Sequence, residues 1–174
     1  MTWKRFAVPA LLGIAVCGTL TGCTVAVGGV TGIAVSEEGR PLGVMLVCRD
    51  HIDGATLYDS DDADDSDDSA RLGRWSRAKP ATGFTVWSLE SGGRGWRAEV
   101  PASAAFAPHR TYSLYGWTGD NSSSTAHVTF TAAQFASLEP GQVRWYKGEG
   151  EPGTDRDGNA TTSMGEFRAE GCEG

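Results

Sequence analysis

The sequence predicts an all-β domain, built as a two-sheet sandwich of about seven strands. Three observations lead to this class. Several short segments are rich in aromatic and β-branched residues, each is bounded by Gly, Pro, Asn or Ser, and they follow one another at short intervals along the 174 residues. Strands separated by turn residues at such spacing are typical of sandwiches.

The first two predicted strands form a hairpin. They cover residues 30–35 and 43–49, and residues 38–41 (Glu-Gly-Arg-Pro) supply the reversal between them. Apolar side chains fall on both faces of the second strand, from residue 44 to residue 47. We therefore expect that strand to be central and buried.

Five further strands are predicted, over residues 83–90, 95–100, 111–118, 126–131 and 142–147. Between the last two, Thr131 and Gln134 have the spacing of a capping box, which predicts a short helix. Phe135 and Leu138 are three residues apart and would pack this helix against the domain. Pro140 and Gly141 would end it.

The first hairpin resembles a known kind of module. The spacing of Val30, Gly32, Gly39, Pro41, Leu42, Val44 and Leu46 is similar to the opening of carboxypeptidase-regulatory-like modules and of related transthyretin-like or immunoglobulin-like β-sandwiches. Further on, FAPHRTYSLYGWT resembles the corner that precedes a late strand in such folds, with Tyr112 at the corner position. The resemblance implies an immunoglobulin-like or transthyretin-like β-sandwich over residues 30–147, with the Tyr112 hydroxyl bonded to backbone, and implies no activity.

The N-terminus has the layout of a secretory signal peptide. Lys4 and Arg5 precede an apolar run over residues 6–16, which is too short to cross about 30 Å of hydrocarbon. The following Leu-Thr-Gly-Cys, ending at Cys23, resembles a bacterial lipobox. An ordinary signal peptide with an ordinary Cys23 is the alternative.

The lipobox resemblance implies a lipid anchor. Residues 1–22 would be removed, the Cys23 sulfur would carry a diacylglycerol, and residues 23–29 would link the anchor to the domain. Stable anchoring takes two acyl chains, because a single chain holds only marginally. We therefore expect the protein outside the cytoplasm, held by lipid at the outer face of the cytoplasmic membrane. HIDGATLYD, TYSLYGWT and EPGQVRWY are similar to stretches of secreted or lipoprotein chains of actinobacterial type.

The charge balance excludes one class of partner. Removal of residues 1–22 would take away Lys4 and Arg5 but none of the 22 acidic residues, so the formal net charge would change from −7 to −9. A chain this anionic is not expected to bind nucleic acid, nor to be attracted directly to anionic lipid headgroups.

Two cysteines remain for structure once Cys17 leaves with the signal peptide and Cys23 carries lipid. Outside the cytoplasm, Cys48 and Cys172 are expected to form a disulfide. The alternative is a buried thiol at Cys48 and a loose thiol at Cys172. Residues 148–174 are poor in apolar side chains, so we expect a flexible, acidic, Gly-rich tail unless Cys172 pins its end.

An acidic loop is predicted over residues 59–70. Its candidate calcium ligands are Asp59, Asp61, Asp62, Asp64 and Asp65. The run does not follow the EF-hand pattern, because Ala63 or Ser66 falls at the fifth position and no glycine follows. Three interpretations stay open: a solvated loop, a weak calcium site, which would be the only cofactor, and a docking patch for a partner. A second fragment, from Asp155 to Asn159, resembles half of a calcium loop and is expected to be a turn.

The sequence shows no pattern typical of an enzyme. His51 and Asp53 could contribute to a metal site, but no cluster completes a zinc set, and His109 and His127 are isolated. A Gly-x-Ser-x-Gly elbow is missing, and the acids gather in a loop and a tail. We therefore predict a non-catalytic protein.

Aromatic residues supply the candidate binding surface. In the predicted strand 111–118, alternation places Tyr112 and Leu114 on one face and Tyr115 and Trp117 on the other. If the first face is core, Tyr115 and Trp117 form a platform on which a glycan or peptide could stack. The alternatives are that this face is covered or belongs to the core. Trp75, among arginines, is expected to form cation-π pairs.

These observations predict a membrane-anchored lipoprotein with a binding or interaction module for an envelope protein or a glycan. A calcium-stabilised structural or adhesion domain and a glycan-binding module are the specific alternatives.

Overall fold

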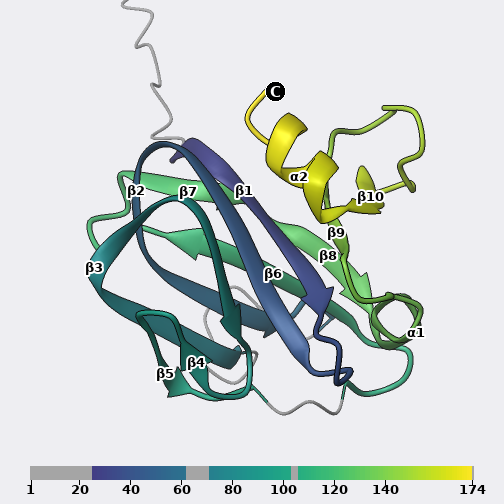
Figure 1. The fold of residues 1–174 in the computed structure, drawn as a ribbon, viewed down its shortest axis with the longest axis horizontal. Coiled ribbons are helices and arrows are strands. Elements are labelled where there is room, and N and C mark those ends of the chain that lie inside the picture. The colour runs from purple at the N-terminus through teal and green to yellow at the C-terminus, as the bar shows by residue number, and fades with distance from the viewer. Residues whose placement is uncertain (1–24, 62–70, 103–105, 174) are drawn as a thin grey trace, which may run out of the picture.

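The structure is a computed structural model that describes residues 25–61, 71–102 and 106–173 (Figure 1). Its strands are β1 (Ala26–Val35), β2 (Pro41–Asp59), β3 (Arg71–Ser88), β4 (Gly92–Gly93), β5 (Trp96–Val100), β6 (Thr111–Trp117), β7 (Ser123–Ala126), β8 (Val128–Thr131), β9 (Gln142–Tyr146) and β10 (Asn159–Ser163). The helices are α1 (Ala132–Ala136) and α2 (Met164–Glu170). The structure is mainly β, as predicted. Within the described ranges, ten strands join into one hydrogen-bonded sheet, where about seven strands in two sheets were expected.

Strand β2 runs through a corner and takes part in two layers. Its residues 41–47 pair with β1, and its residues 54–59 pair with β6. Strand β3 follows β2 along both halves, and the register between them is irregular from Val47 to Ile52. Asp50 takes a φ of 55° at this corner. Bulges and bends of this kind let a strand pass from one layer to the next.

Four strands close on themselves. Strand β1 pairs with β2, β2 with β6, β6 with β7, and β7 returns to β1 in a parallel pairing. They form a small mixed barrel, around which the other strands are added. On the β7 side of β1, β9 pairs with residues 32–34, and β10 lies beyond it.

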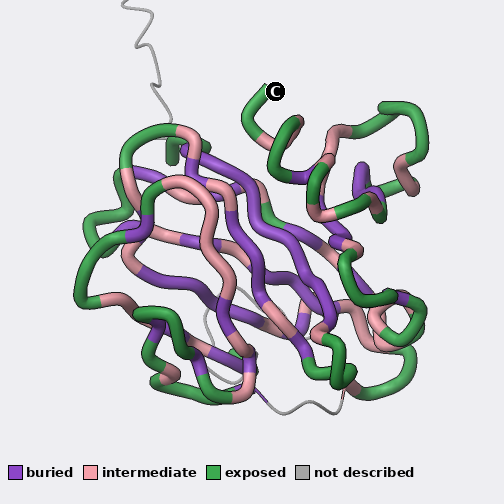
Figure 2. The backbone as a smooth tube through the Cα atoms, viewed as in Figure 1, coloured by how far each residue is buried: buried purple, intermediate pink, exposed green. Residues whose placement is uncertain are grey.

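The main core lies inside these layers. It is built from large side chains that are fully buried, among them Ile33, Met45, Leu57, Trp75, Trp87, Leu114 and Phe130. Buried positions run along the central strands, while exposed positions mark the turns and the outer surface of α2 (Figure 2).

A second apolar cluster explains why β1 and β2 are apolar on both faces. Val30 and Val44 face away from the main core and pack with Val143, Trp145 and Phe167. Phe167 comes from α2 and is fully buried, with 0% of its surface accessible. The predicted burial of residues 43–49 is therefore confirmed for Val44, Met45 and Val47, because α2 covers the second face.

Two local predictions are confirmed by hydrogen bonds. The Tyr112 hydroxyl accepts a bond from the Ala107 amide at 2.6 Å, so the tyrosine holds the corner before β6. At α1, Thr131 and Gln134 exchange both bonds of a capping box. Phe135 and Leu138 contribute to the main core, as expected from their spacing.

The C-terminal segment is pinned. Cys48 and Cys172 form the predicted disulfide, with their Cα atoms 5.5 Å apart. In place of the flexible tail expected over residues 148–174, the chain forms β10 against β9 and then α2 over the second cluster. Ser163 caps α2 by accepting a bond from the Glu166 amide at 3.1 Å.

Candidate ligand-binding hollow

A hollow lies on the outer face of β2 and β6, with β3 and β7 at its sides. Its volume is about 520 Å³, which falls in the range of small-molecule sites. We call it the β2–β6 hollow. The residues that line it are Val25, Thr56, Tyr58, Arg71, Arg74, Tyr115, Trp117, Thr118, Gly119, Asn121, Ser123, Ser124, Thr125 and His127.

Tyr115 and Tyr58 form an aromatic pair in this hollow. Tyr115 lies opposite Thr56 in the β2–β6 ladder, and Tyr58 is two residues further along β2, so the two rings share the outer face. Their centroids are 5.9 Å apart in an edge-to-face arrangement. Both side chains are half-buried, which leaves part of each ring open to a ligand.

Trp117 also faces the hollow, but much of its ring is already in contact. It lies opposite Gly54, where a Cβ would collide with the indole, so the glycine makes room for the ring. The guanidinium of Arg74 lies 4.2 Å from the ring centroid, and the indole Nε1 donates to Thr56 Oγ1 at 2.9 Å. These contacts reduce the area on which a ligand could stack. The expected platform therefore consists mainly of Tyr115 with Tyr58, while Trp117 forms a fixed wall.

The charged side chains that line the hollow are cationic, although the whole chain has a formal net charge of −7. No Asp or Glu is among its described lining residues, whereas Arg71 and Arg74 are. Arg74 Nε donates to Glu99 at 2.9 Å on the neighbouring strand β5. A hydrogen bond from Ser76 lowers the pKa of Glu99, burial opposes this, and the bond and charge of Arg74 lower it further. Glu99 is therefore ionised at neutral pH and offsets part of the Arg74 charge.

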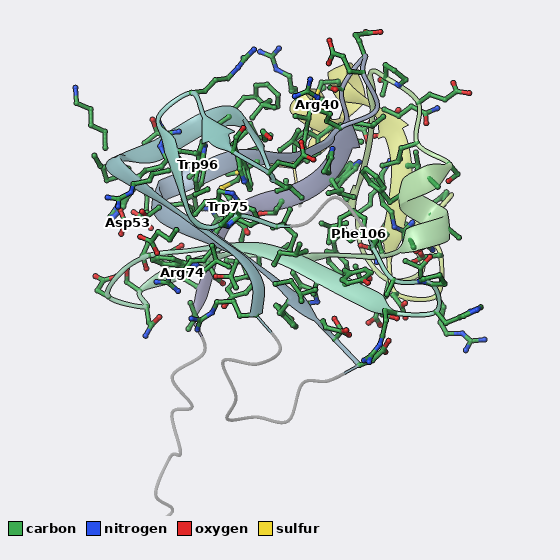
Figure 3. The ribbon with its side chains drawn as sticks, turned by 90° about the horizontal axis from the view of Figure 1, so that it is seen from below. Arg40, Asp53, Arg74, Trp75, Trp96 and Phe106 are labelled. Atoms are coloured by element: carbon green, nitrogen blue, oxygen red, sulfur yellow. A yellow bond between two sulfur atoms is a disulfide. The ribbon has the colours of Figure 1, made fainter. Side chains whose placement is uncertain are left out.

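Trp75 does not form the expected cation-π pair. It follows Arg74 on β3, and neighbouring residues of a strand point to opposite faces. Trp75 is fully buried beside Trp87, whereas Arg74 lies outside (Figure 3). The cation-π pairs among the described residues join Arg74 to Trp117, Arg77 to Trp96 and Arg168 to Phe84, at 4.2, 5.1 and 4.6 Å.

The acidic run is described at its start only. Asp59 is mostly buried and lies 3.3 Å from Arg110 Nη1, and Asp61 accepts a bond from the Thr111 amide at 2.8 Å. Both carboxylates thus already hold the corner that leads to β6. Asp62, Asp64 and Asp65 lie outside the described residues. Within the described ranges, no group of three or more His, Cys, Asp or Glu side chains could hold a metal ion.

The other polar candidates lie at separate places in the fold. His51 lies 3.6 Å from Asp53, and the Asp53 carboxylate accepts a bond from the Gly119 amide at 2.8 Å, which ties the β2 corner to the turn after β6. His109 takes a φ of 65° in its turn. His127 lines the β2–β6 hollow, where sequence alone gave it no role.

The segment from Asp155 to Asn159 is a turn, as expected. Asp155 accepts bonds from the amides of Asp157 and Asn159 at 3.0 and 2.9 Å. It also pairs with the buried guanidinium of Arg144. Burial alone would raise the pKa of Asp155, but the hydrogen bond and charge of Arg144, together with the Asn159 amide, lower it overall.

Comparisons with protein-family models, with curated proteins and with solved structures found no match for this chain. Among the described residues, no helix is long and apolar enough to span a membrane. The predicted lipidation site, Cys23, lies outside the described residues. Function is therefore inferred from the geometry of the hollow.

Proposed function

We propose that this protein is an envelope lipoprotein whose β domain binds a glycan in the β2–β6 hollow. The observation that carries the proposal is the half-buried pair of Tyr115 and Tyr58 in a hollow of about 520 Å³. Sugar rings have apolar C–H faces that pack on aromatic side chains, and hydroxyls that need hydrogen-bond partners. Ser124, Asn121 and His127 line the same hollow and can supply those partners.

The lining supports binding without hydrolysis. Cleavage of a glycosidic bond normally uses two carboxyl groups, one on each side of the bond. The described lining residues bring aromatic rings, hydroxyls, an amide and guanidinium groups to the hollow, and no carboxyl group. We therefore propose a non-catalytic module.

The N-terminal sequence supports the location. The basic start, the short apolar run and the Leu-Thr-Gly-Cys box that ends at Cys23 have the order that lipid attachment requires. In this proposal, a diacylglycerol on Cys23 holds the domain at the outer face of the cytoplasmic membrane, where envelope glycans are within reach.

For the fold, we propose a variant of the immunoglobulin-like or transthyretin-like sandwich. Three features support it: the hairpin of β1 and β2, the tyrosine corner at Tyr112, and a core enclosed between layers that share β2 and β3. The closed ring through β7 is the feature in which this chain departs from two separate sheets.

Retention on insoluble polysaccharide tests the function. The full chain, solubilised in detergent, is passed over chitin, cellulose and peptidoglycan sacculi. We expect retention on at least one of them, and a loss of about tenfold in affinity for Tyr115→Ala, which corresponds to roughly 1.4 kcal/mol. Tyr146→Ala is the matched control, because Tyr146 is a half-buried tyrosine on β9 away from this hollow.

Two results would contradict the proposal. One is that the wild type is retained on none of the three polysaccharides. The other is that Tyr115→Ala binds as tightly as the wild type while both melt at the same temperature.

A further inference from the structure

Two large apolar side chains are exposed at the start of β1. Val25 has 40% and Val27 has 58% of its surface accessible. Residues two apart on an extended chain point to the same side, so these two valines form one apolar edge. Val25 also lines the β2–β6 hollow, and Val27 lines a second hollow of about 420 Å³ beside the disulfide.

The register shows what surrounds this edge. Ala26 pairs with Ser123 of β7, and Gly29 pairs with Val47 just before the β2 corner. The turn over residues 118–122 and the corner over residues 48–53 therefore lie at the same end of the domain. The turn over residues 36–40 lies at the opposite end of β1, about 30 Å away for a strand of this length.

The position of the predicted anchor fixes which end can meet the membrane. Only Thr24 separates Cys23 from Val25 in the sequence. A chain spans at most about 3.6 Å per residue, so a lipidated Cys23 keeps the Cα of Val25 within roughly 7 Å of its own. The geometry points to docking of the Val25–Val27 edge on the outer surface of the lipid bilayer, with the β2–β6 hollow beside the headgroups. This inference rests on the proposed lipidation of Cys23.

The charges around the edge decide which lipid suits it. Arg49 is exposed there, but so are Asp50 and Asp120. A hydrogen bond from Ser122 is the largest cause that lowers the pKa of Asp120 to about 2, so this carboxylate is charged at neutral pH. Asp50 and Asp120 outnumber Arg49 at this edge, but Arg71 and Arg74 of the neighbouring hollow bring the opposite sign. Because the charges on this end of the domain nearly balance, apolar contact of the valines with a zwitterionic surface is favoured over attraction to anionic headgroups.

Hydrogen exchange tests the docking. The full acylated chain is reconstituted in phosphatidylcholine vesicles and compared with the Cys23→Ser chain in solution. We expect exchange to slow at least threefold at residues 25–28 and 118–122, and to stay unchanged at residues 36–40. Val27→Asp should abolish the slowing, whereas Val100→Asp, at a valine with 41% accessible surface on β5, should keep it.

Mass spectrometry of the intact protein separates the proposed lipidation of Cys23 from the proposed docking of the Val25–Val27 edge. A chain that carries no diacylglycerol on Cys23 would overturn the anchoring itself. An acylated chain that exchanges equally in vesicles and in solution, or is protected at residues 36–40, would overturn the docking and leave the anchor standing. Protection that also develops in the Cys23→Ser chain as its concentration rises would assign the edge to a second copy and overturn the inference.

Discussion

Arg144 is a buried cation, and Asp155 is the carboxylate that compensates it. The Arg144 side chain has 7% of its surface accessible, and its Nε donates to the Thr129 carbonyl at 2.8 Å. A buried charge without its partner is strongly destabilising. The turn that carries Asp155 thus holds the chain between β9 and β10 against β8.

Asp155→Asn is expected to lower the free energy of unfolding by about 2 kcal/mol, less than for a fully buried pair, because Asp155 is itself 32% exposed. Folding lowers the Asp155 pKa below its ordinary value of 3.8, so its contribution is complete above about pH 4 and is lost as the pH falls through the folded value. Thermal melts from pH 2 to pH 7 measure both effects.

Asp157→Asn is the control for this pair, since Asp157 is exposed in the same turn. The variant should melt like the wild type. An Asp155→Asn variant with an unchanged melting temperature at pH 7 would show that Arg144 does not depend on this carboxylate.

Gly54 is the residue that gives Trp117 its place. Gly54→Ala would put a methyl group into the indole, so we expect a loss of about 1–3 kcal/mol in stability and weaker glycan retention. Gly165→Ala in α2 would place its methyl group 3.8 Å from Ser163 Oγ, which is an ordinary contact, and should be neutral or stabilise by up to about 1 kcal/mol. Denaturant unfolding of both variants tests this, and an equal effect of the two would refute the proposed role of Gly54.

At the scale of elements, hydrophobic pattern predicted most of the strands but not their full length. The predicted strand over residues 43–49 continues as β2 to Asp59, because pairing with β3 and β6 carries it past the polar corner. The predicted strand over residues 126–131 is split into β7 and β8 at His127. Such boundaries depend on partners distant in sequence, which a local pattern does not contain.

Helix α2 was missed because its sequence shows little of its role. Only Met164 and Phe167 give it an apolar side, too few for a helical pattern. The sequence signal for α2 lay instead in β1 and β2, because their second apolar face required another element to bury it.

The disulfide is expected to hold α2 in this position. It joins residues 124 apart, for which the chain-entropy argument gives about 4–5 kcal/mol. The double variant Cys48→Ser with Cys172→Ser should melt well below the wild type, with faster hydrogen exchange in α2 than in β6. Wild-type protein treated with reductant should show the same lower melting temperature and the same faster exchange in α2 as the double variant. Unchanged melting and exchange would show that Phe167 packing alone holds the helix.

At the scale of the whole molecule, the hollow depends on ring closure. Alternation within one strand correctly placed Tyr115 and Trp117 away from Tyr112 and Leu114. Tyr58 and Arg74 come from other strands, and the parallel pairing of β1 with β7 brings Ser124 together with Val25, which directly precedes β1. A parallel pairing between strands almost a hundred residues apart leaves no local pattern, so the platform could be predicted but the hollow around it could not.

The most direct measurement of the central claim is an NMR titration of the tryptophan indole signals. The Trp117 Nε1–H bonds to Thr56 in the β2–β6 hollow, and the Trp145 Nε1–H bonds to Thr162 between β9 and β10, away from the lining of this hollow. Trp117→Phe and Trp145→Phe assign the two signals, and a soluble fragment of the polysaccharide that retains the protein is added. The account predicts a saturable shift of the Trp117 signal with the Trp145 signal unmoved. A shift of Trp145 alone, or of neither signal, would contradict it.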